Sequence, residues 1–316
     1  MLIWIKMLKI KKKMNEIKYS NEVYYICKMN NQQLCVGLEN GEIYIYNFQK
    51  DFSLILEIKN EFQIIFNIFI MKDNSILIST FSKIIIIVID INKKKYKINE
   101  KLIINHYNPF LDTFAIETNN NGILCSTNDE IILWYKNNNN KFEIVKKIDC
   151  ERIVELLELN NIYFVGIYFY ENQHKILSIF DFENFQIIIS LFGNNFDSGC
   201  LRKINQKIFI FINESILNFF DYEKMQIIKQ ISFLNLYNGY SVSTILKLKN
   251  GNLLISLELN KSSIDLTKKM ILVEYEINNN KFNEYYFLDD NIIYCLNEYL
   301  NYWIMGGASC KLIILE

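Results

Sequence analysis

The stretch LCVGLENGEIYIYN, residues 34–47, contains the pattern that decides the fold. An apolar run ends in the small residue Gly37, a tight turn carries Asn40-Gly41, and an alternating run ends in the pair Tyr46-Asn47. Short runs rich in β-branched and aromatic residues predict strands, and Asn-Gly is a frequent hairpin turn. The stretch therefore predicts two antiparallel strands joined by a short turn.

The same strand–turn–strand pattern recurs along the chain, giving seven copies in all. The other copies lie at residues 76–90, 123–136, 162–181, 207–221, 252–276 and 302–316. The second strand of each copy would be the third strand of a four-stranded blade. The ends of these strands are 43, 45, 46, 40, 55 and 40 residues apart, and the longest interval falls on the copy with the longest turn. A period of roughly 40–45 residues is typical of four-stranded propeller blades. The sequence therefore predicts an all-β fold, a seven-bladed β-propeller of four-stranded antiparallel blades.

The strand ends resemble those of the WD-repeat (WD40-like) family, in which the third strand of a blade commonly ends in Trp-Asp. Five of the first positions are aromatic and five of the second are acidic in the pairs Tyr46-Asn47, Ile89-Asp90, Trp134-Tyr135, Phe180-Asp181, Phe220-Asp221, Tyr275-Glu276 and Leu315-Glu316. The family's Gly-His dipeptide is absent, and the chain has only two histidines. The buried Asp–His–Ser/Thr–Trp network of that family cannot be built, so we expect the blades to depend on apolar packing.

The two ends of the chain are expected to share one blade. The copy at residues 302–316 stops after its third strand, while residues 1–22 precede the first blade. We expect part of residues 1–22 to add the missing strand, which would leave no open sheet edge. The expected organisation is one domain over residues 1–316, with blades starting near residues 23, 64, 112, 152, 199, 242 and 292.

Composition favours a folded protein of the cytoplasm, with a nuclear location left open. The chain is 51% hydrophobic, which supplies a core, and its formal net charge of −1 gives no field to gather nucleic acid. The longest aliphatic run, Ile84 to Ile89, is too short for membrane insertion. The seven cysteines form no C-x-x-C pair, so we interpret them as reduced thiols.

No sequence motif for catalysis, cofactor binding or metal binding is present. There is no phosphate-binding glycine loop, no H-x-x-x-H pattern and no serine nucleophile elbow. The leading hypothesis is therefore a non-catalytic scaffold or adaptor that binds partner proteins. Two alternatives stay open: a propeller hydrolase or oxidoreductase with a ligand in the central channel, and a structural subunit of a large assembly.

The resemblance also implies a place for partner binding. In WD-type propellers, the loops that lead into each blade share one face with the turns between second and third strands. The sequence predicts enlarged turns of that kind from Tyr168 to Lys175 and from Leu259 to Lys269. Aromatic residues are favoured interface anchors, and Pro109 stiffens the loop that carries three of the candidates. The expected partner-binding residues are Phe62, His106, Tyr107, Phe110, Tyr168, Tyr170, Phe196, Tyr237 and Tyr240.

Overall fold

The structure, a computed structural model, divides the chain into two compact units. One unit contains residues 25–198, and the other contains residues 1–24 together with residues 199–316. The residues described are 13–29, 32–48, 52–59, 61–62, 64–80, 83–103, 114–127, 129–150, 153–170, 174–193, 196, 199–237, 240–259, 270–287, 292–299 and 302–316.

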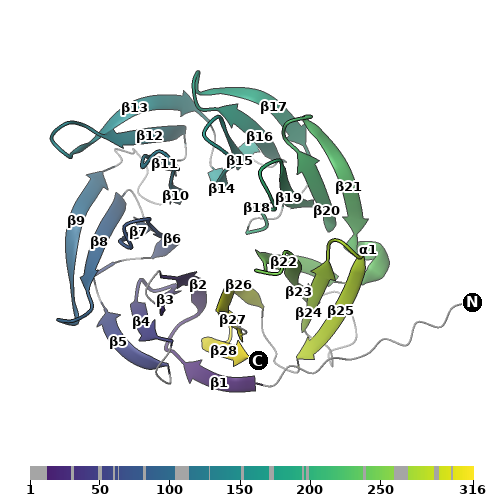
Figure 1. Ribbon diagram of the computed structural model, residues 1–316, viewed down its shortest axis with the longest axis horizontal. Helices are drawn as coiled ribbons and strands as arrows, with labels where there is room; N and C mark the ends of the chain where they lie inside the picture. The colour runs from purple at the N-terminus through teal and green to yellow at the C-terminus, as the bar shows by residue number, and fades with distance from the viewer. Residues whose placement is uncertain are drawn as a thin grey trace, which may run out of the picture. The chain divides into compact units, whose positions relative to one another are not determined.

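The unit of residues 25–198 contains four four-stranded antiparallel sheets, each formed by consecutive strands (Figure 1). The first two sheets are β2 (Val23–Lys28), β3 (Gln33–Leu38), β4 (Ile43–Asn47) and β5 (Ser53–Ile58), and then β6 (Ile65–Ile70), β7 (Ile76–Thr80), β8 (Lys83–Asp90) and β9 (Lys95–Ile103). The next two are β10 (Phe114–Glu117), β11 (Ile123–Ser126), β12 (Glu130–Lys136) and β13 (Phe142–Asp149), and then β14 (Ile153–Glu158), β15 (Tyr163–Tyr170), β16 (His174–Asp181) and β17 (Gln186–Phe192).

The second unit contains three such sheets. Two have consecutive strands: β18 (Arg202–Lys203), β19 (Ile208–Asn213), β20 (Ile216–Asp221) and β21 (Gln226–Ser232), and then β22 (Tyr240–Lys247), β23 (Leu253–Leu259), β24 (Met270–Glu276) and β25 (Lys281–Phe287). The third has the order β1-β28-β27-β26, with β1 (Lys13–Lys18), β26 (Ile293–Tyr299), β27 (Tyr302–Gly307) and β28 (Lys311–Leu315).

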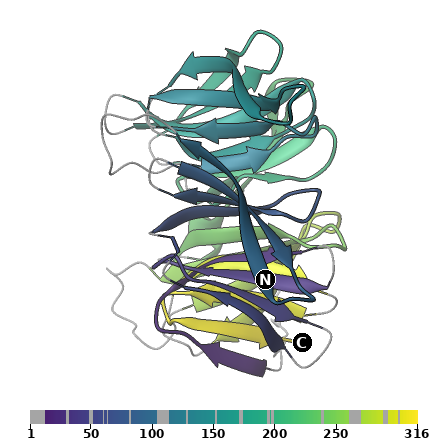
Figure 2. The ribbon, with the colours of Figure 1, turned by 90° about the vertical axis from the view of Figure 1, so that its left-hand side faces the viewer.

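These seven sheets of described residues are the blades of a seven-bladed β-propeller, as the repeat predicts. Figure 2 shows the strong twist within each sheet that is usual for antiparallel strands. The first strands of the blades begin at residues 23, 65, 114, 153, 202, 240 and 293, each within three residues of its expected start. One element was not predicted, the four-residue helix α1 (Phe233–Leu236), which lies between β21 and β22.

The closing strand is confirmed. β1 pairs with β28 in an antiparallel ladder that runs from Lys13 opposite Leu315 to Lys18 opposite Lys311 (Figure 1). Beyond the ladder, the backbone N–H of Tyr19 donates to the carbonyl oxygen of Cys310 at 2.8 Å. The N-terminal stretch therefore covers the edge of β28 that would otherwise be open, while residues 1–12 lie outside the described residues.

Adjacent blades within each unit pack through apolar faces, as expected. Trp134 of β12 is 8% exposed and belongs to a buried cluster that joins its blade to the preceding one through Leu77 and Ile84. Its indole N–H donates to the sulfur of Cys125 at 3.4 Å. The five aromatic residues at the first positions of the paired strand ends are all buried, at Tyr46, Trp134, Phe180, Phe220 and Tyr275.

Polar links between blades supplement this packing. In one set, a buried or partly buried side chain of a first strand donates to a carbonyl of the next blade's first strand. Asn67 Nδ2 donates to the Ala115 carbonyl at 2.8 Å, and Ser243 Oγ donates to the Ile293 carbonyl at 2.5 Å. Buried polar groups are stable only when they are hydrogen-bonded, so these links fix neighbouring blades in register.

A second set uses a glutamate at the end or near the end of the first strand. Glu117 accepts from the backbone N–H of Lys72 at 2.7 Å, and Glu298 accepts from that of Lys249 at 2.7 Å. Each donor lies in the first turn of the preceding blade, so the glutamate holds that turn in place. Such charge-assisted bonds add polar links between neighbouring blades to the apolar packing.

Candidate functional site

Five of the aromatic residues expected to bind a partner lie in the packed interior. Phe62, Tyr168, Phe196, Tyr237 and Tyr240 are between 1% and 8% exposed. Phe62 packs between the first two blades of its unit, and Tyr237 and Tyr240 pack against the β18–β21 and β22–β25 blades. Rings with so little exposed area offer almost no surface to a partner.

The second-to-third-strand turn of the β14–β17 blade is shorter than the sequence indicated. Ladder pairing continues from Tyr168 opposite Ile176 to Tyr170 opposite His174, so these residues belong to strands β15 and β16. The Tyr168 hydroxyl also lies 3.0 Å from Ser178 Oγ. The expectation of a turn beginning at Tyr168 is therefore corrected, because the continuous apolar and aromatic run of β15 extends the hairpin.

The remaining candidates cannot be placed. His106, Tyr107 and Phe110 lie outside the described residues, and so does the side chain of Tyr170. Their role in partner binding stays a prediction from the sequence.

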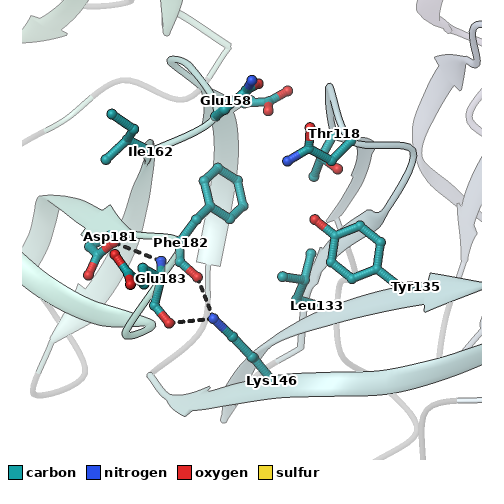
Figure 3. A pocket seen from close by; sticks show the side chains of 11 residues that line it. Thr118, Leu133, Tyr135, Lys146, Glu158, Ile162, Asp181, Phe182 and Glu183 are labelled. Carbon is teal, nitrogen blue, oxygen red and sulfur yellow. Dashed lines mark hydrogen bonds between the residues drawn. The ribbon is translucent and has the colours of Figure 1, made fainter.

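The structure places a pocket elsewhere, between the β10–β13 and β14–β17 blades (Figure 3). Its volume is about 270 Å³, and we call it the Tyr135 pocket after a residue of its wall. It lies at the end of the strands where Glu158 pairs with Phe164, opposite the end where Ile153 pairs with Tyr168. The pocket therefore lies at the end of these blades opposite the turn near Tyr168, where the sequence predicts partner binding.

One wall of the pocket depends on a glycine. A Cβ at Gly122 would lie 2.6 Å from Tyr135 Cε1 and 2.9 Å from the Trp134 carbonyl oxygen, both far inside van der Waals contact. Only glycine therefore lets the Tyr135 ring lie directly against the β10–β11 turn. The buried side chain of Leu133, two residues earlier on β12, lines the pocket beside it.

Lys146 of β13 fixes the opposite blade. Its ammonium donates to the Phe182 carbonyl at 2.8 Å and to the Glu183 carbonyl, both in the β16–β17 turn (Figure 3). Lys146 therefore joins the two walls of the pocket, and two of its three hydrogen-bond donors are already used.

The β16–β17 turn is organised by Asp181, the acidic residue of a paired strand end. Its carboxylate accepts from the backbone N–H groups of Glu183 and Asn184 at 2.7 and 3.0 Å. Burial would raise the pKa of Asp181, but these backbone hydrogen bonds, the Asn184 amide and the nearby Lys146 charge together lower it below its usual value. Asp181 is thus an ionised structural residue beneath the pocket.

The groups that the pocket presents are a mixture of acidic, aromatic and aliphatic. Among the described residues, the structure shows no hydrogen-bond partner for the Tyr135 hydroxyl or the Glu183 carboxylate. Glu158 lines another edge, and both of its oxygens accept from the Asn119 backbone N–H. Ile162 is 56% exposed at the rim, where it adds an apolar surface.

The sequence does contain a signal for this pocket. Tyr135 occupies the position that is acidic in most of the other copies, where Asp181 and Asp221 bind the backbone of the following turn. In the β10–β13 blade, Asn137 serves this purpose two residues later by accepting from the N–H groups of Asn139 and Lys141. The displaced turn leaves Tyr135 free to form a pocket wall.

The described residues also bear on metal binding, thiol chemistry and membrane crossing. No three His, Cys, Asp or Glu side chains there are grouped as metal ligands would be. Burial raises the pKa of the Cys27 and Cys125 thiols to about 12, so neither is a ready nucleophile at neutral pH. No helix in this part of the chain has the length and apolar character that a bilayer crossing requires.

Comparisons with known proteins identify the fold. No protein-family model matches the sequence, and no curated protein matches it. The chain is similar to the crystal structure of the WD40 β-propeller domain of Doa1, with 9% sequence identity, a TM-score of 0.71, and 97% of each chain covered. At this identity the likeness shows the fold alone, which is a WD40-type β-propeller.

Proposed function

We propose that the protein is a non-catalytic platform that binds a partner protein at the Tyr135 pocket. The observation that supports this most strongly is the exposed rim residue Ile162, 56% exposed beside a pocket whose walls are held by Lys146. A preformed pocket with an apolar rim gives a partner an anchoring point at a low ordering cost. We place this activity in the cytoplasm, where buried thiols such as Cys35 and Cys125 remain reduced.

The pocket is better suited to one side chain than to a cofactor. Its volume of about 270 Å³ is below the range of about 300–1,000 Å³ usual for small-molecule sites. Its walls come from turns of two blades, and turns are common recognition elements on rigid scaffolds.

The test is capture of partners by tagged protein from the cells that naturally produce it, identified by mass spectrometry. Ile162→Asp puts a charge on the rim, and we expect it to lose the specific partners. Ile187→Asp is the matched control, because Ile187 is 44% exposed on β17 and does not line the pocket. A photo-cross-linking amino acid at position 162 should attach to the same proteins that Ile162→Asp loses.

A third variant tests whether the partner binds instead at the proline-containing loop predicted from the sequence. Tyr107→Ala combined with Phe110→Ala removes the aromatic residues of the proline-containing loop. Loss of partners in this double variant, with retention in Ile162→Asp, would move the platform to that loop. Identical partner sets in all variants would contradict a platform at either place.

A further inference from the structure

The charges around the Tyr135 pocket favour a cationic ligand. Three carboxylates line it, from Glu158, Asp181 and Glu183, against the single ammonium of Lys146. That ammonium is bound to two backbone carbonyls, which leaves it little capacity to bind an anion. Carboxylates that outnumber the local cation attract a positively charged group.

The acceptors of the pocket are placed for several donors at once. The carboxylate of Glu158, which accepts from the backbone N–H of Asn119, contributes its negative charge to the pocket. Glu183 is exposed and its carboxylate has no described partner, and the Tyr135 hydroxyl is likewise available as an acceptor. Figure 3 shows Glu158 and Glu183 on different sides of the space that Tyr135 faces.

The apolar and aromatic walls add a requirement for shape. Phe182 packs on Phe164 with ring centroids 4.8 Å apart, which holds its ring steady at the pocket. Tyr135 supplies a second ring from the facing blade, and Ile162 supplies an aliphatic surface at the rim. A planar cation on a long aliphatic stem can stack on such rings while its stem covers the isoleucine.

Resting on the proposed function, we propose that the Tyr135 pocket binds an arginine side chain of the partner protein. The guanidinium is planar and has five N–H donors, which suits acceptors on several sides, whereas the ammonium of lysine is a compact point charge. The stem lies against Ile162 and Phe182, and the head group reaches Glu158 and Glu183. The partner is thus recognised by an exposed arginine.

The test uses three defined probes, Nα-acetyl-arginine methylamide and the matching lysine and citrulline derivatives, with binding measured by ligand-observed NMR. A single residue should bind with a Kd on the order of 1 mM, and the arginine probe should bind at least about threefold more tightly than the lysine probe. Citrulline keeps the shape of arginine without its charge, and we expect no measurable binding for it at 10 mM, roughly tenfold above that Kd. Equal affinity of the three probes would overturn the proposal.

Matched variants assign the binding to this pocket. Glu183→Gln should weaken arginine binding by about two- to fivefold, as for other exposed ion pairs. Glu223→Gln is the control, because Glu223 follows Asp221 at the corresponding position of the β18–β21 blade and should leave binding unchanged. Both substitutions are at exposed side chains, and circular dichroism melting confirms that each variant is folded.

The outcomes separate this inference from the platform itself. If Ile162→Asp loses partners but the arginine probe is not preferred, arginine recognition is wrong and the platform stands. If arginine binds and responds to Glu183→Gln while Ile162→Asp keeps every partner, the pocket is an arginine site and the proposed platform is wrong. Weaker binding in Glu223→Gln than in Glu183→Gln would overturn the assignment to this pocket.

Discussion

Both carboxylate oxygens of Glu158 accept a hydrogen bond from the backbone N–H of Asn119, at 3.0 and 2.8 Å, across the boundary between two blades. Glu117 and Glu298 make the same contact with the first turns of the blades that precede them. The contact therefore recurs within both units, and it links a strand of one blade to a turn of its neighbour. Its contribution to stability can be measured directly.

We expect Glu158→Ala to lower the free energy of unfolding by about 1–2 kcal/mol, since a hydrogen bond to a charged group is lost from a partly exposed site. Glu158→Gln keeps an acceptor oxygen and should cost about half as much. Urea denaturation followed by circular dichroism measures both. Glu183→Ala is the control, and an equal effect for Glu183→Ala and Glu158→Ala would show that the link to Asn119 contributes nothing.

Trp134 tests the apolar packing between blades. The residue is 8% exposed in a cluster that includes Leu77 of the preceding blade, so Trp134→Ala should cost about 3–5 kcal/mol. The neighbouring Tyr135 is only partly buried, and Tyr135→Ala should cost less than half of that amount. Comparable losses for the two variants in urea denaturation would contradict the packing that the structure assigns to Trp134.

The closing strand makes a prediction for truncated proteins. Deleting residues 1–20 removes β1, leaves the edge of β28 unpaired, and should lower the melting temperature by at least about 5 °C with reduced solubility. Deleting residues 1–12 keeps β1, which begins at Lys13, and should change the melting temperature much less. Thermal melts and sedimentation compare the two. Equal melting temperatures for the two truncations would mean that β1 does not stabilise its blade.

The lowered pKa of Asp181 predicts that the free energy of unfolding depends on pH. Its pKa is lower in the folded protein than in the unfolded chain, so its stabilising effect is present above the unfolded value and is lost as the pH falls through the folded one. Asp181→Asn should therefore cost about 1 kcal/mol at pH 7, and the difference from wild type should shrink below about pH 4. Urea denaturation across pH 2.5–8, roughly spanning the usual carboxyl range, tests this. A constant difference over that range would contradict an ionised Asp181 as the organiser of the turn.

Much of the fold could be predicted because it is recorded in local patterns. The alternation within residues 34–47, the repeat interval and the missing last strand are properties of neighbouring residues or of spacing, and they predict the strands, the blades and β1. Tyr168 and Tyr240 show the limit of this reasoning. Both are strand residues in the structure, because aromatic residues at a strand end resemble those of a loop until the ladder partners are known.

The candidate site could not be predicted in the same way. Lys146 and Phe182 are 36 residues apart, and their contact joins a side chain to a backbone carbonyl, which leaves no pattern in the sequence. The burial of Phe62 and Phe196 has a related cause, since loop aromatics fill space against blades whose packing is not local. Tyr135 stands out in the sequence at a position that is acidic in most copies, but its place in a pocket depends on the turn of the next blade.

Gly122 provides the sharpest test of the pocket geometry. In Gly122→Ala the new methyl group would meet Tyr135 and the Trp134 carbonyl, so we expect a cost of about 1–3 kcal/mol and a displaced Tyr135 ring. Part of that clash is with the ring itself. In a Tyr135→Ala background, the same glycine substitution should therefore cost at least about 0.5 kcal/mol less, because residues in contact do not contribute additively.

A double-mutant cycle compares wild type, Gly122→Ala, Tyr135→Ala and the double variant by urea denaturation. It separates the coupling between Gly122 and the Tyr135 ring from the contact with the backbone carbonyl. The matched comparison is Gly166→Ala, where the nearest atom to a new Cβ is the flexible end of Leu156 at 3.3 Å and not Tyr135. Tyr135→Ala should leave the cost of Gly166→Ala unchanged, because the atoms nearest to that Cβ belong to Leu156, Phe180 and Glu155 and not to Tyr135. If Gly122→Ala and Tyr135→Ala prove additive, the ring does not lie against the β10–β11 turn, and the wall on which the arginine proposal depends is absent.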